Sequence, residues 1–404
     1  MQTKLTSEVL ETEAGKEADG ILRNCVHCGF CTATCPTYQL LGDELDGPRG
    51  RIYLIKEMLE NNHASEKTLE HLDRCLGCSS CETTCPSGVA YMHLAQIGKS
   101  LAEEKAGRPL GQRVVRKLLL SLLPHRARFS ILVSLLRVFR PFLPRNRRKQ
   151  LEKGNNSSFS VQNSHARKVL LIEGCVQPSL SPEIDSATIT LLDRLGIETL
   201  RTGQAQCCGA VENHLGAKDA GLARIRANID AWLPLLEGAE AVISTASACA
   251  LEIKEYGYLM RHDPEYREKA EQLSSMSKDI SEVLVAESLD EIRISEPKRI
   301  AFHPPCTLQH GQKLKGVVEG ILTSTGFELT PIPDSHLCCG SAGTYSLLQP
   351  ELGGLMRENK VNALLSGNPE LIATSNIGCQ SHLKGGMDLP VLHWVELLAN
   401  GIDR

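Results

Sequence analysis

Short apolar runs alternate with amphipathic stretches throughout the C-terminal half of the chain. Apolar runs bounded by turn residues are typical of buried strands, and apolar residues three and four positions apart are typical of helices. The expected strands are 168–173, 241–245, 299–303 and 371–374, and the expected helices are 183–195 and 317–325. Strands that alternate with helices form parallel βαβ units, so the pattern predicts α/β structure in this half.

The C-terminal half is an internal duplication that includes its cysteines. Four cysteines recur at an offset of 131 residues, or 130 for the last, and each Cys–Cys pair precedes a glycine. The two sets are Cys175, Cys207, Cys208 and Cys249, and Cys306, Cys338, Cys339 and Cys379. Because loops at the carboxyl ends of parallel strands gather on one edge of a sheet, we expect each set to converge. Adjacent cysteines can present two sulfurs to one polynuclear metal centre; a vicinal disulfide or two buried thiols are the alternatives.

The N-terminal part has the apolar spacing of helices. The sequence Asp46-Gly47-Pro48 gives an N-cap and an early-proline signal ahead of a helix expected at 49–60. A second helix is expected at 65–73.

A basic segment separates the two halves. Residues 108–153 contain 13 Lys and Arg but one acidic residue, Glu152, although the whole chain has a net charge of −4. Arginines interrupt its apolar blocks, so no run reaches the roughly 20 apolar residues that span a bilayer. The segment is therefore either an amphipathic element that meets anionic headgroups or a helical connector that packs on this protein or a partner. Nucleic acid is a poor fit, because the basic run lacks interleaved aromatic residues and the rest of the chain is acidic.

The composition of the chain limits the classes of protein and of chemistry that it can represent. The chain has 404 residues, 42% of them apolar, which is enough for several packed domains and excludes wholesale disorder. Its first 20 residues are polar and acidic and lack the pattern of a secretory signal, so we expect a protein of the cytoplasmic side. There, 16 cysteines indicate metal or redox chemistry rather than disulfides.

The first eight cysteines form two copies of one motif. Each copy has the spacing C-x2-C-x2-C-x3-C-P, which is the bacterial pattern for [4Fe–4S] binding, with the fourth cysteine serving the other cluster. The predicted ligands are Cys25, Cys28, Cys31 and Cys85 for cluster 1, and Cys35, Cys75, Cys78 and Cys81 for cluster 2. A pair of zinc sites is the alternative, but zinc sites use two short Cys/His pairs rather than four-cysteine runs.

Other cofactor motifs do not occur in the sequence. No G-x-G-x-x-G follows an expected strand, and there is no phosphate-binding loop, C-x-x-C-H or H-E-x-x-H. Clusters transfer single electrons, whereas metabolites are commonly oxidised by two. A flavin on a partner subunit would supply that chemistry.

The sequence resembles two known groups of proteins. The second half is similar to the CCG repeats of heterodisulfide reductase B subunits, whose motif ends in C-x-x-C and uses five cysteines for an unusual [4Fe–4S] centre. Ala246 and Asn376 stand where that motif has its additional cysteine. His214, His303, His336 and His382 lie near the cysteines and could supply a ligand or a proton.

The whole chain resembles the iron–sulfur subunits of bacterial glycolate oxidase. The resemblance rests on NCVHCGFCTATCPTY, GPRGRIYLIKEML, DRCLGCSSCETTCPSGV, GCVQP and CCGSAGTYS. It implies a FAD-binding, glycolate-oxidising partner, a second flavoprotein-like subunit, electron delivery to a membrane acceptor such as quinone, and peripheral attachment to the inner membrane. D-Lactate is a further expected substrate. Alternatives are a subunit of glycerol-3-phosphate or lactate dehydrogenase, a disulfide reductase that uses the CCG cysteines, or a zinc-structured scaffold.

The predicted architecture is α+β and multidomain. We expect an α-helical ferredoxin-type domain with two [4Fe–4S] clusters at 1–105, a basic amphipathic connector at 106–160, and CCG repeats at 161–297 and 298–404. The Gly/Asn/Ser-rich stretch 154–160 is predicted to be a linker.

Overall fold

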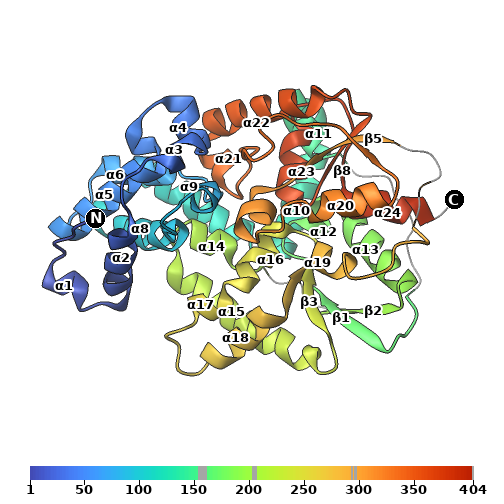
Figure 1. The fold of residues 1–404 in the computed structure, drawn as a ribbon, viewed down its shortest axis with the longest axis horizontal. Helices are drawn as coiled ribbons and strands as arrows, with labels where there is room; N and C mark the ends of the chain where they lie inside the picture. Colours follow the sequence, from blue (N-terminus) through green and yellow to red (C-terminus); the bar gives the residue numbers. More distant parts are fainter. Residues whose placement is uncertain (153–161, 203–206, 293, 295–297, 403–404) are drawn as a thin grey trace.

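The computed structural model describes residues 1–152, 162–202, 207–292, 294 and 298–402. An all-helical N-terminal part lies at one end of the molecule and two sheets lie at the other (Figure 1). The linker predicted at 154–160 falls outside the described residues.

The N-terminal part is a small helical domain. Its helices are α1 (Ser7–Leu10), α2 (Glu13–Asn24), α3 (Phe30–Ala33), α4 (Pro36–Leu41), η1 (Glu44–Asp46), α5 (Pro48–Asn61), α6 (Glu66–Asp73), α7 (Ser80–Thr83) and α8 (Tyr91–Ala106). Helix α8 packs against α2, α5 and α6 around the fully buried Leu22, Ile55 and Leu94. The helices expected at 49–60 and 65–73 are confirmed as α5 and α6. Gly47 is the N-cap of α5. The buried carboxylate of Asp46 contacts Arg51, His71 and Arg74 instead.

Each repeat contains a four-stranded parallel sheet, as the alternating pattern predicts. The strands are β1 (Arg167–Leu171), β2 (Ile197–Arg201), β3 (Ala241–Ser244) and β4 (Ser277–Asp279), then β5 (Arg299–His303), β6 (Glu328–Leu329), β7 (Leu371–Thr374) and β8 (Val391–His393). The strand orders are β2-β1-β3-β4 and β6-β5-β7-β8, and every pairing is parallel. The shared order shows that the duplication covers the whole topology.

Helices flank both sheets. In the first repeat they are α12 (Gln177–Leu180), α13 (Glu183–Arg194), α14 (Ala210–His214), α15 (Lys218–Trp232), η3 (Leu233–Leu236), α16 (Ser247–Lys254), α17 (Tyr256–Leu259), α18 (Arg267–Met276) and α19 (Ile280–Leu284). In the second they are the π-helix η4 (Thr307–Gly311), α20 (Val317–Ser324), α21 (Tyr345–Leu348), α22 (Pro350–Leu365), α23 (Ile377–Lys384) and α24 (Trp394–Ile402).

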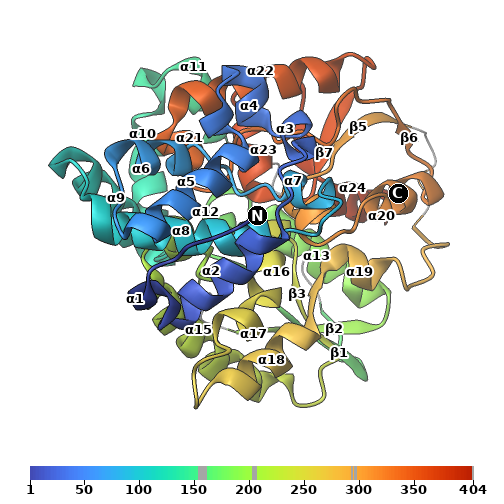
Figure 2. The same cartoon turned by 60° about the vertical axis from the view of Figure 1, so that its left-hand side comes forward.

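The two repeats share one apolar core. Helix α13 of the first repeat packs on α24 of the second, and α19 of the first packs on α20 of the second, so the helices of the two repeats lie side by side (Figure 2). A single buried cluster extends from Val169 and Ile243 in the first sheet to Phe302 and Trp394 in the second repeat. The repeats are therefore packed as a pair.

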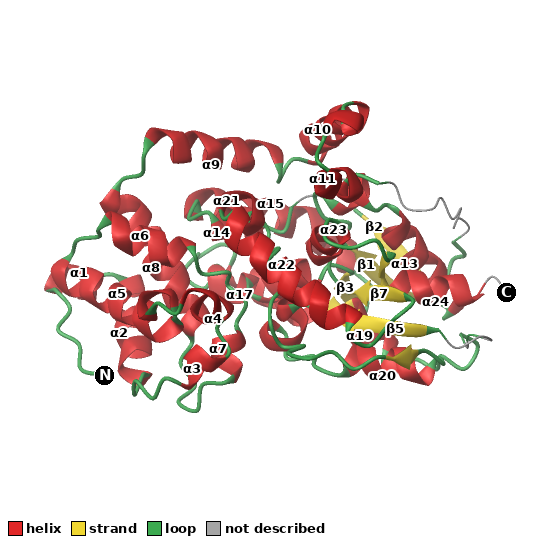
Figure 3. Cartoon of the chain, turned by 90° about the horizontal axis from the view of Figure 1, so that it is seen from above, coloured by secondary structure: helices red, strands yellow, loops and turns green. Residues whose placement is uncertain are grey.

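The basic connector forms helices on one side of the molecule (Figure 3). They are α9 (Leu110–Leu122), α10 (Arg126–Val138), η2 (Arg140–Phe142) and α11 (Arg145–Gln150). Helix α11 contacts α23, and Lys149 Nζ donates to the carbonyl oxygen of Met387 at 2.7 Å. Within the described part of the chain, no single helix is long and apolar enough to cross a membrane. The pair α9 and α10 passes that test together but is bent by 106°.

Candidate metal centres

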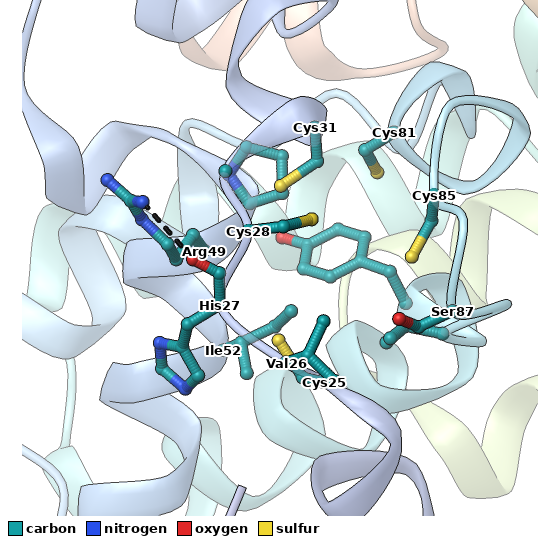
Figure 4. A pocket seen from close by; sticks show the side chains of 14 residues that line it. Cys25, Val26, His27, Cys28, Cys31, Arg49, Ile52, Cys81, Cys85 and Ser87 are labelled. Carbon is teal, nitrogen blue, oxygen red and sulfur yellow. Dashed lines mark hydrogen bonds between the residues drawn. The ribbon is translucent and has the colours of Figure 1, made fainter.

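The cysteines predicted to bind cluster 1 surround one pocket of the N-terminal domain. Cys25, Cys28 and Cys31 come from the first motif, and Cys85 reaches the same pocket from the second. Figure 4 shows the side chains of these four residues directed toward a common space. Four thiols around one pocket are the donor set of a [4Fe–4S] cluster.

A second pocket holds the cysteines predicted for cluster 2. It is lined by Cys35 from the first motif and by Cys75, Cys78 and Cys81 from the second. Cys81 lines the first pocket as well, so the two pockets adjoin. The structure thus brings together both predicted sets, and the residues present fit two clusters; the assignment of each ligand to its cluster stays a prediction.

Local backbone conformation explains how three cysteines of each motif reach one pocket. The residue two after the first cysteine and the residue after the second both have positive φ. They are His27 and Gly29 in the first motif, and Gly77 and Ser79 in the second. Two left-handed residues in each loop wind it tightly enough to aim successive thiols inward. Left-handed backbone is costly for residues other than glycine, so His27 and Ser79 are held there by the folded loops.

Polar side chains contact the sulfurs of the second pocket. The buried guanidinium of Arg51 places Nη1 4.0 Å from Cys35 Sγ and donates from Nη2 to Thr37 Oγ1 at 3.1 Å. The phenol of Tyr91 donates to Cys75 Sγ at 3.5 Å. Burial raises the pKa of Cys75, but the charges of Arg51 and Lys99 outweigh burial and lower it. These contacts favour the thiolate of Cys75, whereas burial raises the pKa of Cys78 and Cys81 well above the usual range of a thiol. The contacts of Arg51 and Tyr91 were not predicted, because neither residue belongs to the cysteine motif.

The first pocket lies at the protein surface. Cys28 is exposed, and its neighbours Val26 and Phe30 are 66% and 61% exposed. By contrast, Cys81 between the pockets is buried. One edge of the cluster 1 pocket therefore faces solvent through an apolar rim.

The cysteines of each repeat converge, as the topology predicts. In the first repeat, Cys175 and Cys207 share a hydrogen bond that raises the pKa of Cys175 and lowers that of Cys207. In the second, Cys306 Sγ lies 4.0 Å from Cys338 Sγ. The glycine after the Cys–Cys pair is needed there, because a Cβ on Gly340 would meet the carbonyl oxygen of Gly353 at 2.6 Å.

The two residues that replace the expected cysteines pack between the repeats. Asn376 accepts from the backbone N–H of Gly378 at 2.9 Å and donates to Ser247 Oγ of the other repeat at 3.3 Å. Ala246 is buried with Ile184 and Ile377. These positions serve helix capping and contact between repeats.

The four candidate histidines have different surroundings. His382 Nε2 contacts the carbonyl oxygen of Gly353 at 3.1 Å. His214 is exposed beside a pocket between the N-terminal domain and the repeats, and His336 is partly exposed. Only His303, of these four, lies with its ring nitrogens near repeat cysteines in a candidate metal group, together with Cys339 and Cys379.

The N-terminal domain contacts the second repeat next to its cysteines. Cys78 from the cluster 2 pocket and Cys306 from the second repeat both pack against an apolar cluster that contains Leu76, Cys338 and Tyr345. Thr83 and His310 also bridge the two parts, with Oγ1 and Nδ1 3.0 Å apart. The cysteines of the cluster 2 pocket and those of the second repeat therefore lie on either side of one apolar cluster, an arrangement that no local sequence pattern indicates.

Known proteins match the chain along its whole length. Residues 21–89 match the family model of the 4Fe-4S dicluster domain, and residues 169–254 and 300–384 match that of the cysteine-rich domain. The glycolate oxidase iron–sulfur subunit of Escherichia coli (strain K12) is 53% identical over 406 residues, covering 100% of both chains. A probable glycolate oxidase iron–sulfur subunit of Bacillus subtilis (strain 168) is 29% identical over 96% of this chain and 94% of its own. Lactate utilization protein A of Bacillus licheniformis is 28% identical over 57% of this chain and 98% of its own.

Proposed function

Since this chain belongs to the family of glycolate oxidase iron–sulfur subunits, we propose that it carries electrons from a flavin-bearing, glycolate-oxidising partner to quinone in the membrane. The chain is an electron-transfer subunit of an oxidoreductase complex. A [4Fe–4S] cluster bound in each N-terminal pocket supplies one-electron transfer. The observation that carries the proposal is the row of cysteines from exposed Cys28, past Cys81, to Cys78 and Cys306.

The flavoprotein partner is proposed to dock on the rim of the cluster 1 pocket. Electron transfer between proteins requires close approach, and Cys28 is the exposed ligand in this domain. Val26 and Phe30 give the rim an apolar surface, and exposed apolar patches mark sites of protein association. In this arrangement Cys81 leads inward, toward the second pocket and the second repeat.

Helices α9 and α10 are proposed to rest on the membrane. Apolar side chains on them are exposed, among them Leu110 at 77% and Val138 at 72%, and Phe142 just beyond is 85% exposed. The segment carries a large excess of Lys and Arg. Exposed apolar side chains beside cations suit an interface with anionic lipid. This attachment would bring the complex to a quinone.

Two finer assignments complete the proposal. A second flavoprotein-like subunit joins the complex, and D-lactate is a further substrate of it. Both rest on the family resemblance. The lactate-related relative covers 57% of this chain, and we propose glycolate as the main substrate because the glycolate oxidase relative covers all of it.

The experiment compares two exposed phenylalanines in the assembled complex. Phe30→Glu alters the proposed flavoprotein surface, and Phe142→Glu alters the proposed membrane surface. The complex is mixed anaerobically with glycolate and a soluble quinone. EPR follows the reduction of the iron–sulfur clusters, and absorbance follows the reduction of the quinone. We expect Phe30→Glu to slow reduction at least tenfold and Phe142→Glu to leave it unchanged.

Membrane attachment is measured separately with the same two variants. We expect Phe142→Glu to weaken co-sedimentation with vesicles that contain phosphatidylglycerol, Phe30→Glu to have no effect, and added salt to weaken binding of the wild type. If glycolate leaves the EPR-visible centres oxidised, the electron-transfer proposal fails. If Phe142→Glu binds vesicles like the wild type, the proposal that this exposed end of the connector rests on the membrane fails.

A further inference from the structure

His303 is a buried histidine without a hydrogen-bond partner. It ends strand β5 with 1% of its surface exposed. Neither ring nitrogen has a partner among the residues that the structure describes. A buried polar group without a partner costs about 1–3 kcal/mol, and buried imidazoles are normally paired. A group that binds the ring nitrogen would remove this cost.

One ring nitrogen of His303 lies close to two cysteines of the second repeat. One nitrogen of His303 and the sulfurs of Cys339 and Cys379 all lie within 4.8 Å of one another. Cys338 is adjacent to Cys339, and its sulfur lies 4.0 Å from that of Cys306. Four thiols and one imidazole therefore meet at the carboxyl edge of the second sheet. Thiolate and imidazole are both ligands of iron–sulfur centres.

A positive charge lies beside this cluster of donors. The ammonium of the buried Lys360 donates to the carbonyl oxygens of Asp334 and Ser335 at 2.9 and 3.3 Å. Its charge reaches the sulfurs of Cys338 and Cys339. A buried cation next to several thiols suits a centre that carries negative charge, because buried charges are stable when they are paired.

The first repeat lacks the nitrogen donor. The offset of 131 residues places Ile172 at the position that matches His303. Ile172 is buried in an apolar cluster with Leu170 and Val242, and its side chain cannot bind a metal. The difference gives the chain an internal control for the role of His303.

We infer that the second repeat holds an iron–sulfur centre with His303 as one of its ligands. His303 takes the place of the cysteine that the family motif has at position 376, where Asn376 caps a helix instead. The centre adjoins the cluster 2 pocket through Cys306 and Cys78. It would be a third site for electrons after the two N-terminal clusters, and this role rests on the proposed function.

The full-length chain, purified anaerobically, is the material for the test. Iron and acid-labile sulfide are quantified, and pulsed EPR is recorded on protein with 15N-labelled histidine in its oxidised and reduced states. The wild type should contain clearly more than the about eight irons that two clusters require, and should show coupling to a histidine nitrogen. His303→Ala should lose the excess iron and the nitrogen coupling while retaining about eight irons, which also reports that the chain folds.

Two further variants sharpen the result. His303→Cys should restore the excess iron without the nitrogen coupling, and Ile172→Ala in the first repeat should leave both signals unchanged. Wild-type iron content and coupling in His303→Ala would overturn the inference, as would zinc in place of the excess iron. About eight irons and no excess in the wild type would contradict only this inference, whereas fewer than eight would contradict the proposed function.

Discussion

Arg51 Nη2 lies 3.5 Å from Asp46 Oδ1, and both side chains are 1% exposed. The same carboxylate meets His71 Nδ1 and Arg74 Nη1, each at 2.9 Å. Arg51 also donates to the carbonyl oxygen of His71 at 2.7 Å. This group joins the start of α5 to the end of α6 and stands directly behind Cys35.

Arg51→Leu should strongly destabilise the N-terminal domain. Removing one partner of a buried ion pair costs about 3–5 kcal/mol when the other charge is left alone. Because Arg74 and His71 stay beside the Asp46 carboxylate, we expect a loss at the lower end, about 3 kcal/mol. The measurement is chemical denaturation of the cluster-loaded chain under anaerobic conditions. Arg23→Leu is the control, because its pair with Asp19 lies at the surface and is worth at most about 1 kcal/mol. Equal losses in the two variants would contradict this account.

Tyr91→Phe should lower the reduction potential of cluster 2 and leave its iron in place. The phenol donates to Cys75 Sγ, and a hydrogen bond to a ligand sulfur stabilises the reduced, more negative state. A bond worth about 1 kcal/mol corresponds to a shift of roughly 40 mV for one electron. An EPR-monitored redox titration measures it, with Tyr53→Phe as the exposed control. An unchanged potential in Tyr91→Phe would rule out this bond as a tuning element.

Acid should destabilise the paired repeats through His393. Its Nε2 donates to the carbonyl oxygen of Thr245 in the other repeat at 3.0 Å, and burial lowers its pKa to about 4. The folded ring stays neutral while the unfolded chain takes up a proton near pH 6.5. The unfolded state therefore binds more protons below pH 6.5, and stability falls as pH drops from about 6.5 to about 4.

The test of this prediction is the slope of unfolding free energy against pH. His393→Gln should reduce the slope between pH 4 and 6.5 by up to one proton, whereas His63→Gln, at an exposed position, should not change it. A slope that is identical in wild type and His393→Gln would show that this histidine is charged in the folded state or exposed.

Asn376→Ala should loosen the contact between the repeats. It removes the cap of α23 and the hydrogen bond to Ser247 Oγ, and loss of a side-chain cap costs about 1 kcal/mol. Urea denaturation should show a loss of about 1–2 kcal/mol. Asn61→Ala is the control, because that amide donates only to Glu57 of its own helix at an exposed site. A loss no larger than in the control would mean that water replaces both bonds.

The arrangement of strands and cysteine sets was predictable because both follow from local spacing. Three cysteines of each motif sit on one tight loop, and the rule for the fourth cysteine links the loops. The parallel sheets followed from alternating strands and helices, and the convergence of Cys306, Cys338, Cys339 and Cys379 followed from the sheets. These inferences needed only periodicity and topology.

Contacts across long stretches of sequence were not predictable in this way. The approach of Cys78 to Cys306 depends on how the N-terminal domain packs against the second repeat. Packing between domains does not show in the periodicity of the sequence. The four histidines near the repeat cysteines looked alike in sequence, and only packing separates His303 from His382. Asp46 looked like part of a helix start because caps are acidic, yet its carboxylate is buried against two arginines and His71.

The core that the two sheets share makes each repeat a scaffold for the other. A fragment with a single repeat would leave half of that core in water and would have to pair with a second copy to cover it. In the intact chain the first repeat keeps this supporting role whatever its own cysteines bind, because Val169 and Ile243 contribute by packing alone. The second repeat can therefore carry His303 where the first has Ile172, because the shared core does not depend on what the cysteines of either repeat bind.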